Sequence, residues 1–329
     1  MIKIIKNEKG ADSTRTLEVE IAWAAVEKSK EKTFESLKNT FELPGFRKGK
    51  VPEKMILEKV GEEALLEESA QNAIEDVYGD IMKEANIFPV AMPRVVIKKI
   101  ESGSPLLIEI LVDVFPEISI GDWKKNASKV KVETPEEVTE KEVEDVVAEI
   151  TRMRAPEGGT LTDDFVKTLG DFKDIQDFKD KIKDNLAKEK ERKAKEKTRL
   201  AKLKAVTDGA SIEVPHSFVE NELEQMKHEF SVDLEQSGEN FENYKKQIGK
   251  TDAEIFDLWR PKAKDRVLNE LVLSEIIKTE KLTADAEKQK HEVEHLKEHY
   301  PDATDEKLNN FVSDLLKKEE AFKLLESLS

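Results

Sequence analysis

The chain contains one stretch that cannot belong to a helix interior: Pro44-Gly45-Phe46-Arg47-Lys48-Gly49-Lys50-Val51-Pro52. It holds two glycines and two prolines within nine residues. Glycine is entropically costly inside a helix, and proline removes a backbone hydrogen-bond donor. Because the residues on both sides are typical of helices, the stretch predicts a tight, exposed loop that joins two helices.

The charge of this loop is opposite to that of the whole chain. The chain has a formal net charge of −16, whereas the loop carries Arg47, Lys48 and Lys50, and Lys54 follows one turn later. Phe46 is the only large apolar residue at the tip. An exposed ring flanked by cations suits docking to an anionic or mixed surface, because the cations steer the encounter and the ring supplies contact area. The alternative is a solvated turn with Phe46 folded back into the core.

The composition excludes several classes of protein. Of the 329 residues, 38% are charged and 6% are aromatic, and there is no cysteine. The length predicts two or three domains, and the absence of cysteine excludes disulfide and thiolate chemistry. The acidic balance argues against general coating of nucleic acid. We expect no secretory signal, and no apolar run approaches the roughly 20 residues of a membrane span. These features predict a cytoplasmic protein that makes no membrane contact.

Residues 1–115 are predicted to form an α+β domain. Apolar and polar residues alternate over 17–21, and over 106–114 an aliphatic residue occupies every second position, with Leu107, Glu109, Leu111 and Asp113 between them. Both patterns have the period of a half-buried strand. The turn at 102–105 predicts that the last two strands form a hairpin. Apolar residues spaced by three and four indicate a helix over about 62–85. We expect a small antiparallel sheet with helices on one face and the loop at the far tip.

The rest of the chain is predicted to be helical. Residues 116–159 form a linker with one helix, which begins at the capping box Thr139–Glu142. Residues 160–329 form the helical arm region, and a second capping box lies at Thr251–Glu254. Within it, 177–206 is highly charged with widely spaced apolar residues, which indicates a long arm packed on one flank. The predicted fold class is an α+β N-terminal domain, with a small antiparallel sheet and helices, followed by a linker and an elongated all-α C-terminal domain.

One pattern suggests a metalloprotease. His291-Glu292-Val293-Glu294-His295 fits H-E-x-x-H, in which the two histidines hold zinc and the glutamate acts as general base. Catalytic zinc needs a dry pocket and a third ligand, whereas the flanking residues here are charged. We interpret the pattern as fortuitous, and binding of added metal is a better interpretation than proteolysis. We expect no catalytic residue, no metal site and no cofactor.

The helical region contains scattered apolar residues that so charged a chain cannot bury around one centre. Apolar positions left on a concave, charge-rimmed surface would bind unfolded segments weakly and without sequence specificity. The alternative for any single residue is packing between the arms. The predicted client-binding residues are Phe178, Met226, Phe230, Phe311 and Phe322.

The loop resembles the ribosome-docking loop of trigger factor, a family of bacterial nascent-chain chaperones. Other stretches resemble the same family in the same order: Phe115-Pro116-Glu117-Ile118, Ile212-Glu213-Val214-Pro215 and Arg260-Pro261-Lys262-Ala263. The resemblance implies ribosome binding through Gly45, Phe46, Arg47, Lys48, Gly49 and Lys50. The implied partners are protein and rRNA of the large ribosomal subunit near the exit tunnel, together with nascent or unfolded polypeptides, which the arms shield without ATP. A homodimer is compatible with it.

One departure from the family pattern is large. Family members usually carry a peptidyl-prolyl isomerase domain, whereas here the linker passes at 154–160 directly into the helical arm region. No set of strands and aromatic residues that could build an isomerase pocket lies between them. We therefore expect the isomerase domain to be absent and the chain not to be an enzyme. The rival interpretation is a helical scaffold or adaptor without client-holding activity, which an aggregation assay would distinguish from a chaperone.

Overall fold

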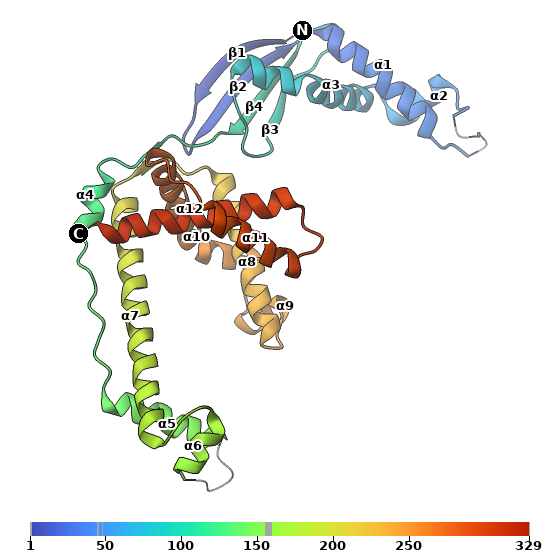
Figure 1. Ribbon diagram of the computed structural model, residues 1–329. Coiled ribbons are helices and arrows are strands. Elements are labelled where there is room, and N and C mark those ends of the chain that lie inside the picture. Colours follow the sequence, from blue (N-terminus) through green and yellow to red (C-terminus); the bar gives the residue numbers. More distant parts are fainter. Residues whose placement is uncertain (1, 45, 48, 155–159, 329) are drawn as a thin grey trace. The chain divides into compact units, whose positions relative to one another are not determined.

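The computed structural model describes residues 2–44, 46–47, 49–154 and 160–328 (Figure 1). The chain packs as two compact units. The first comprises Met1–Ile118 and Ile212–Leu268, and the second comprises Ser119–Ser211 and Asn269–Ser329. Each unit is therefore assembled from two stretches that are distant in sequence. The three-part division predicted from the sequence stays a prediction.

The sheet of the first unit has four antiparallel strands in the order β1-β2-β4-β3. The strands are β1 (Ile2–Lys9), β2 (Thr14–Ile21), β3 (Arg94–Lys99) and β4 (Leu106–Asp113). In the register of β2 with β4, Val19 lies opposite Ile108 and Leu17 lies opposite Ile110. All four side chains are fully buried, whereas their neighbours along each strand are partly exposed. The predicted alternation and the β3–β4 hairpin are confirmed, because only one face of the sheet is buried.

Two long helices cover the buried face of this sheet. They are α1 (Trp23–Thr40) and α3 (Glu62–Ala85), with the short α2 (Glu53–Val60) between them in sequence. Since α1 has 18 residues, it spans about 27 Å. It starts directly after β2, so its far end and the loop that follows lie remote from the sheet (Figure 1).

The contact between α1 and α3 is lined by small side chains. Ser29, Thr33 and Ser69 are buried there, and their size allows the two helices to approach closely. Thr33 donates its hydroxyl to the carbonyl of Ser29 at 2.8 Å and accepts a hydrogen bond from Asn72 Nδ2 at 2.8 Å. Because its hydroxyl is paired, Thr33 is buried without the penalty of an unsatisfied polar group.

The first unit also contains helices from the C-terminal half. These are α8 (His216–Gln236), α9 (Phe241–Ile248) and the first part of α10 (Asp252–Thr279), which continues through Pro261. Ser13 Oγ donates to the carbonyl of Glu213 at 2.7 Å, and the Ser217 amide donates to Asp113 Oδ2 at 3.1 Å. The capping box at the start of α10 is confirmed, because the Thr251 amide donates to Glu254 Oε2 at 2.8 Å.

The second unit is formed mainly by helices. Its elements are α4 (Trp123–Ser128), α5 (Glu140–Arg154), α6 (Asp163–Leu169), α7 (Ile175–Asp208), the rest of α10, α11 (Ala286–His299) and α12 (Asp305–Ser327). The short strands β5 (Ile118–Ser119) and β6 (Ser211–Ile212) lie where the chain passes between the units. The predicted charged arm corresponds to the 34-residue α7. None of the described helices is long and apolar enough to cross a membrane.

Lys190 on α7 connects the linker to this helix through hydrogen bonds. Lys190 Nζ donates to the carbonyl of Glu137 at 2.9 Å and to Glu142 Oε2 at 2.8 Å. The Thr139–Glu142 capping box is confirmed, with the Thr139 amide donating to Glu142 Oε2 at 2.9 Å. The hydrogen bond from Lys190, followed by those from Thr139, lowers the pKa of Glu142 to about 2. One lysine thus joins the linker, the start of α5 and the middle of α7.

A buried lysine joins α7 to the end of α12. Lys202 is fully buried, and its Nζ donates to the carbonyls of Leu325 and Glu326 at 3.2 Å each and also to that of Leu328. The last carbonyls of a helix lack partners within the helix and carry the negative end of its dipole. Lys202 therefore supplies both the missing donors and a compensating charge.

We expect Lys202→Met to lower the free energy of unfolding by about 2 kcal/mol, because three carbonyls at and just after the end of α12 lose the Lys202 donor. Urea unfolding followed by circular dichroism measures this change. Lys204→Met is the matched control, since Lys204 lies two residues along α7 in an exposed ion pair with Asp208. Equal stability of the two variants would contradict the role given to Lys202.

Candidate functional site

The predicted docking loop connects α1 to α2 at the tip of the helical pair. Within it, the Lys50 amide donates to the carbonyl of Arg47 at 2.9 Å, which closes a turn. Gly49 in this turn has φ +77°, a left-handed conformation that favours glycine. Gly45 and Lys48, two of the six predicted ribosome-binding residues, lie outside the described residues.

The tip of the loop presents a ring and cations to solvent. Phe46 is 40% exposed, and Arg47 and Lys50 are exposed as well. Phe46 is thus not folded back into the core. Directly after the tip, Val51 is 2% exposed and Ile56 is fully buried, so the following segment is anchored. The loop therefore combines a fixed base with an apolar and cationic tip.

An ion pair closes the base of the loop. Lys38 in the last turn of α1 lies 2.9 Å from Glu53 in the first turn of α2. Both side chains are well exposed, so the pair adds little stability. Its consequence is geometric, because it ties the two helix ends together. The pair with Lys38 also offsets the negative charge of Glu53, the carboxylate that follows the cationic tip in sequence.

A second feature of the first unit is an aromatic pocket between α8, α9 and α10. The ring of Phe230 lies 4.8 Å from Tyr244, 5.6 Å from Trp259 and 6.3 Å from Phe241, each in an edge-to-face arrangement. A cavity of about 400 Å³ opens beside these rings. Its lining combines Met226, Phe230, Tyr244 and Trp259 with Glu229, Asp233, Lys262 and Arg266. The pocket lining is thus both aromatic and charged.

Ion pairs hold the three helices around this pocket. Arg266 on α10 donates to Glu222 at 2.8 Å and to Glu229 at 3.0 Å, both on α8. The hydrogen bond from Arg266 lowers the pKa of Glu229. At the start of α10, Asp252 accepts from Lys227 of α8 at 2.7 Å and from Lys245 of α9 at 2.5 Å. These contacts fix the relative positions of the pocket walls.

Two family models match the chain. The model described as bacterial trigger factor protein matches residues 3–150, and the model described as the C-terminus of the same protein matches residues 174–325. The chain belongs to the trigger factor family. No isomerase family model matches it. The first trigger factor match ends at residue 150 and the second begins at residue 174.

Individual trigger factors agree with this assignment. The trigger factor of Desulforamulus reducens is 24% identical over 383 aligned positions, which cover 89% of this chain and 88% of that protein. The trigger factor of Lactococcus lactis subsp. lactis is 32% identical over 223 positions, covering 65% of this chain and 51% of that protein. The alignment with the Desulforamulus reducens protein includes about 293 residues of this chain. At the other positions of the alignment, about 90, the relative has a residue and this chain has a gap.

A solved structure supports the fold. A structure of the trigger factor chaperone, described for its promiscuous substrate recognition in folding and assembly, aligns with a TM-score of 0.56. The alignment covers 99% of this chain and all of the other at 16% identity. The predicted fold class is confirmed, with a small antiparallel sheet and helices at the N-terminus and a helix-rich C-terminal region.

The predicted client-binding residues of this trigger factor homologue differ in burial and lie in different parts of the structure. Phe178 is 3% exposed in the core between α5, α6 and α7. Phe322 is partly buried, and the Arg199 guanidinium lies 4.0 Å from its ring centre. Met226 and Phe230 meet in the aromatic pocket. Phe311 is 60% exposed and lies one turn before Leu315, which is 54% exposed, on the same face of α12.

Sequence reasoning missed the contribution of α9 to the pocket. Phe241 and Tyr244 are spaced by three residues on this helix, and Ile248 follows four residues later. Asn240 caps the helix by accepting a hydrogen bond from the Asn243 amide at 2.9 Å. A helix cap followed by an apolar spacing of three and four is the signal that would have predicted this short helix.

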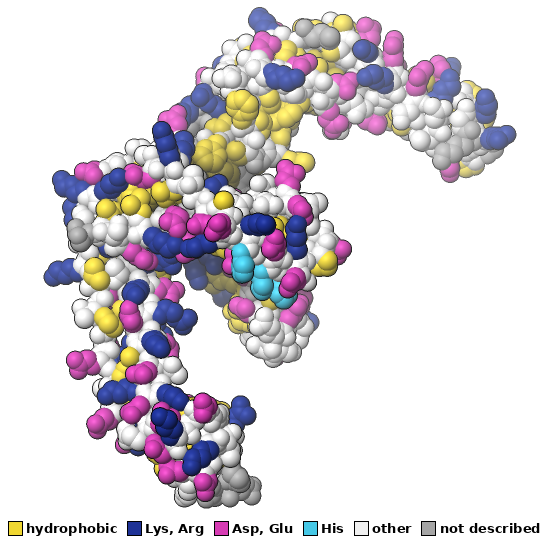
Figure 2. All heavy atoms as spheres, in the orientation of Figure 1, with side chains coloured by type: hydrophobic (Ala, Val, Ile, Leu, Met, Phe, Trp, Pro, Cys, Tyr) yellow, Lys and Arg dark blue, Asp and Glu magenta, His cyan; other side chains and the backbone are white. Residues whose placement is uncertain are grey.

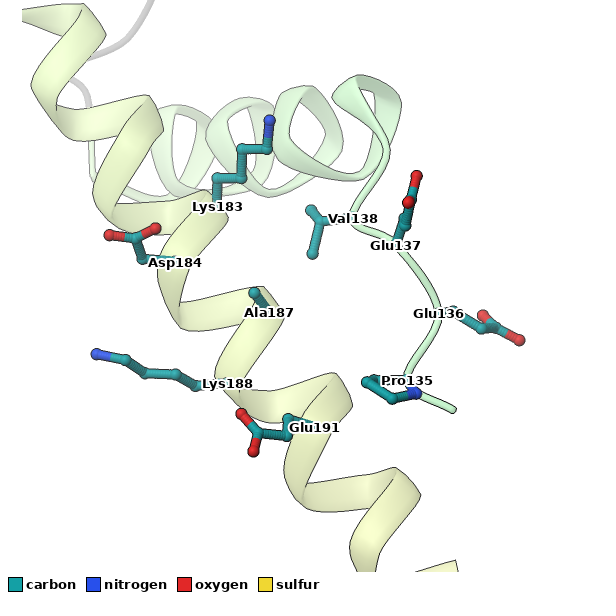
Figure 3. Close-up of a pocket in the computed structure, with 9 residues that line it drawn as sticks. All are labelled: Pro135, Glu136, Glu137, Val138, Lys183, Asp184, Ala187, Lys188 and Glu191. Atoms are coloured by element: carbon teal, nitrogen blue, oxygen red, sulfur yellow. The ribbon is translucent and has the colours of Figure 1, made fainter. Parts of the chain in front are cut away.

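A larger cavity, of about 750 Å³, lies between the linker and α7. Figure 3 shows Pro135 and Val138 directed toward α7, and Glu136 and Glu137 directed away from it. The α7 side is formed by Lys183, Asp184, Ala187, Lys188 and Glu191. Side chains of both charges are interspersed along α7 (Figure 2), and the lining holds carboxylates and lysine amines but no histidine, serine or threonine. The cavity is therefore lined by charged groups of both signs.

The H-E-x-x-H pattern lies on α11 at the surface. His291 and His295 are both exposed, so a metal ion there would lack the dry pocket that a catalytic zinc requires. Among the described residues, no group of three or more histidine, cysteine or acidic side chains converges as a metal site. The geometry thus gives no support to the metalloprotease interpretation.

The ion pairs at Asp252 predict a pH dependence. Hydrogen bonds from Lys227 and then Lys245 lower its pKa from 3.8 to about 2. A carboxyl group with a depressed folded-state pKa contributes stability above the unfolded value and loses it as the pH falls through the folded value. We therefore expect Asp252→Asn to flatten the loss of stability between pH 3.8 and about 2.

Denaturant unfolding followed by far-UV circular dichroism at several pH values measures this slope. Asp233→Asn is the control, because it removes an exposed carboxylate from α8 of the same unit. If Asp252→Asn and the wild type lose stability in parallel over this range, the assigned role of the Asp252 ion pairs is wrong.

Proposed function

We propose that this chain is a chaperone of the cytoplasm that docks on the large ribosomal subunit near the exit tunnel and shields emerging or unfolded polypeptides. The observation that carries the proposal is the exposed tip formed by Phe46, Arg47 and Lys50 on a chain of net charge −16. Membership of the trigger factor family supports it and disfavours the helical scaffold alternative. Isomerase activity is not part of the proposal.

The energies of the loop contacts fit reversible docking. Burial of the Phe46 ring contributes roughly 1.5–3 kcal/mol. Exposed ion pairs of the loop cations contribute about 0–1 kcal/mol each. A micromolar complex requires about 8 kcal/mol, so contacts beyond the tip must contribute. Met55 and Lys54 on α2 are exposed beside the loop and are available for them.

The loop cations are suited to contact either rRNA or ribosomal protein. Arginine binds phosphate groups of rRNA and carboxylates of ribosomal proteins with the same planar donor geometry. Because the loop charges are exposed, salt screens their attraction over a Debye length of about 10 Å at 0.1 M. Docking is therefore expected to weaken as salt is raised, while the contribution of Phe46 persists.

We expect Phe46→Ala, Arg47→Ala and Lys50→Ala together to abolish cosedimentation with ribosomes, because they remove the apolar area and the described loop cations. A matched control is Phe88→Ala, Lys83→Ala and Arg94→Ala, which removes an exposed residue of each type elsewhere in the same unit. The control should bind as the wild type does. Undiminished cosedimentation of a folded loop variant would refute docking through this loop.

The client-binding part of the proposal rests on apolar side chains that remain accessible. The aromatic pocket offers Phe230, Tyr244 and Trp259 beside an open cavity. On α12, Phe311 and Leu315 form an exposed apolar ridge. Both surfaces have charged neighbours, which keep the apolar areas small and favour weak, reversible contacts. Such binding requires no nucleotide, because clients leave by dissociation.

We expect Phe311→Ser with Leu315→Ser to reduce the suppression of aggregation of an unfolded protein. Leu200→Ser with Leu258→Ser is the control, since these side chains are 55% and 63% exposed on two different helices. Light scattering of a denatured client diluted into the chaperone gives the readout. If both double variants suppress aggregation equally well, the ridge on α12 is not a client surface.

A further inference from the structure

Helix α11 carries three of the five histidines of the chain. His291, His295 and His299 follow one another at intervals of four residues, so they lie along one face of the helix. Figure 2 shows histidine side chains gathered in an exposed stripe. This stripe is not explained by docking, by client binding or by the packing of α11 against α12, which uses Val293 and Leu296.

The last two histidines form a close pair. The ring centres of His295 and His299 lie 5.0 Å apart, with an angle of 64° between the ring planes. Both side chains are exposed, and within the described part of the chain neither takes part in a hydrogen bond or ion pair. His291, in contrast, lies 3.7 Å from Glu292. The imidazole nitrogens of the pair are therefore available to an ion from solvent.

We propose that His295 and His299 form an open, two-histidine binding site for a divalent transition-metal ion. Imidazole nitrogen is a preferred ligand of Cu²⁺, Ni²⁺ and Zn²⁺. Such a site is expected to bind Cu²⁺ more tightly than either Ni²⁺ or Zn²⁺. The described residues supply no third ligand to the ion. Water fills the remaining coordination positions, so the ion exchanges readily and the site is not catalytic.

The electrostatic setting favours a cation at this position. His299 is the last residue of α11, where the negative end of the helix dipole attracts positive charge. The site also belongs to a chain of net charge −16. Both effects act on the ion before any ligand bond forms.

Bound metal would stabilise the end of the α11–α12 hairpin. An ion held by residues four apart bridges one turn of helix and opposes its fraying. The same end of α11 is tied to α12 by Lys297, whose Nζ lies 2.8 Å from Asp305. The hairpin core contains Val293, Leu308, Val312 and Leu316. Metal binding thus reinforces a hairpin that otherwise rests on a small apolar contact, whether or not the chain is a chaperone.

Calorimetric titration of the full chain without an affinity tag tests the proposal, with CuSO₄ as the probe. We expect one Cu²⁺ per chain with higher affinity than Ni²⁺ or Zn²⁺. His295→Ala with His299→Ala should weaken Cu²⁺ binding by about tenfold or more. His216→Ala with His228→Ala removes the two histidines outside α11 and should leave binding unchanged.

Amide hydrogen exchange supplies a second readout. Cu²⁺ should slow exchange in the last turn of α11 of the wild type and not in the His295/His299 variant. Equal Cu²⁺ affinity of the two double variants, or binding spread over several weak sites, would overturn the proposal. Loss of binding in His291→Ala alone, with the His295/His299 pair intact, would also overturn it by placing the ion one turn earlier.

Discussion

The 34-residue helix α7 has too few apolar residues to be buried on more than one flank. Charged and hydrophobic residues each make up 38% of the sequence. Since burial of apolar surface is the main favourable term in folding, the chain cannot form one large core around all its helices. It forms separate cores instead: one under the sheet, one where α5, α6 and α7 meet, and one between α11 and α12. Much helix surface therefore remains in water.

Charged hydrogen bonds reinforce the apolar contacts between helices. Lys190 joins the linker and α5 to α7, and Lys202 joins α7 to the end of α12. Asp252 joins α10 to both α8 and α9. Charge-assisted hydrogen bonds are short and directional, so a few of them fix relative positions that a thin apolar contact leaves open. These hydrogen bonds thus help to fix the relative positions of the helices within each unit.

The candidate docking loop is carried by the core beneath the four-stranded sheet. The register of β2 with β4 buries a full row of side chains, and α1 starts directly from the end of β2. The direction of α1 is therefore set by the sheet, and the loop is displaced from it by the length of the helix. Val51 and Ile56 anchor the far side of the loop, and the Lys38–Glu53 ion pair joins its two ends. The base of the loop is thus held by buried side chains and an ion pair.

The sequence by itself determined the local structure and the family of this protein. The two-residue period over 17–21 and 106–114 identified β2 and β4, because a strand with one buried face must repeat every two residues, whereas β1 was not predicted. The capping boxes at Thr139 and Thr251 located two helix starts, because their hydrogen bonds involve neighbours in the chain. Only the tertiary structure decided which apolar residues remain exposed. Phe178 is buried and Phe311 is exposed although both lie on charged helices, and Arg199 covers Phe322 from 123 positions away. Helical spacing shows which face is apolar, but which other helix packs on that face depends on contacts between distant parts of the chain.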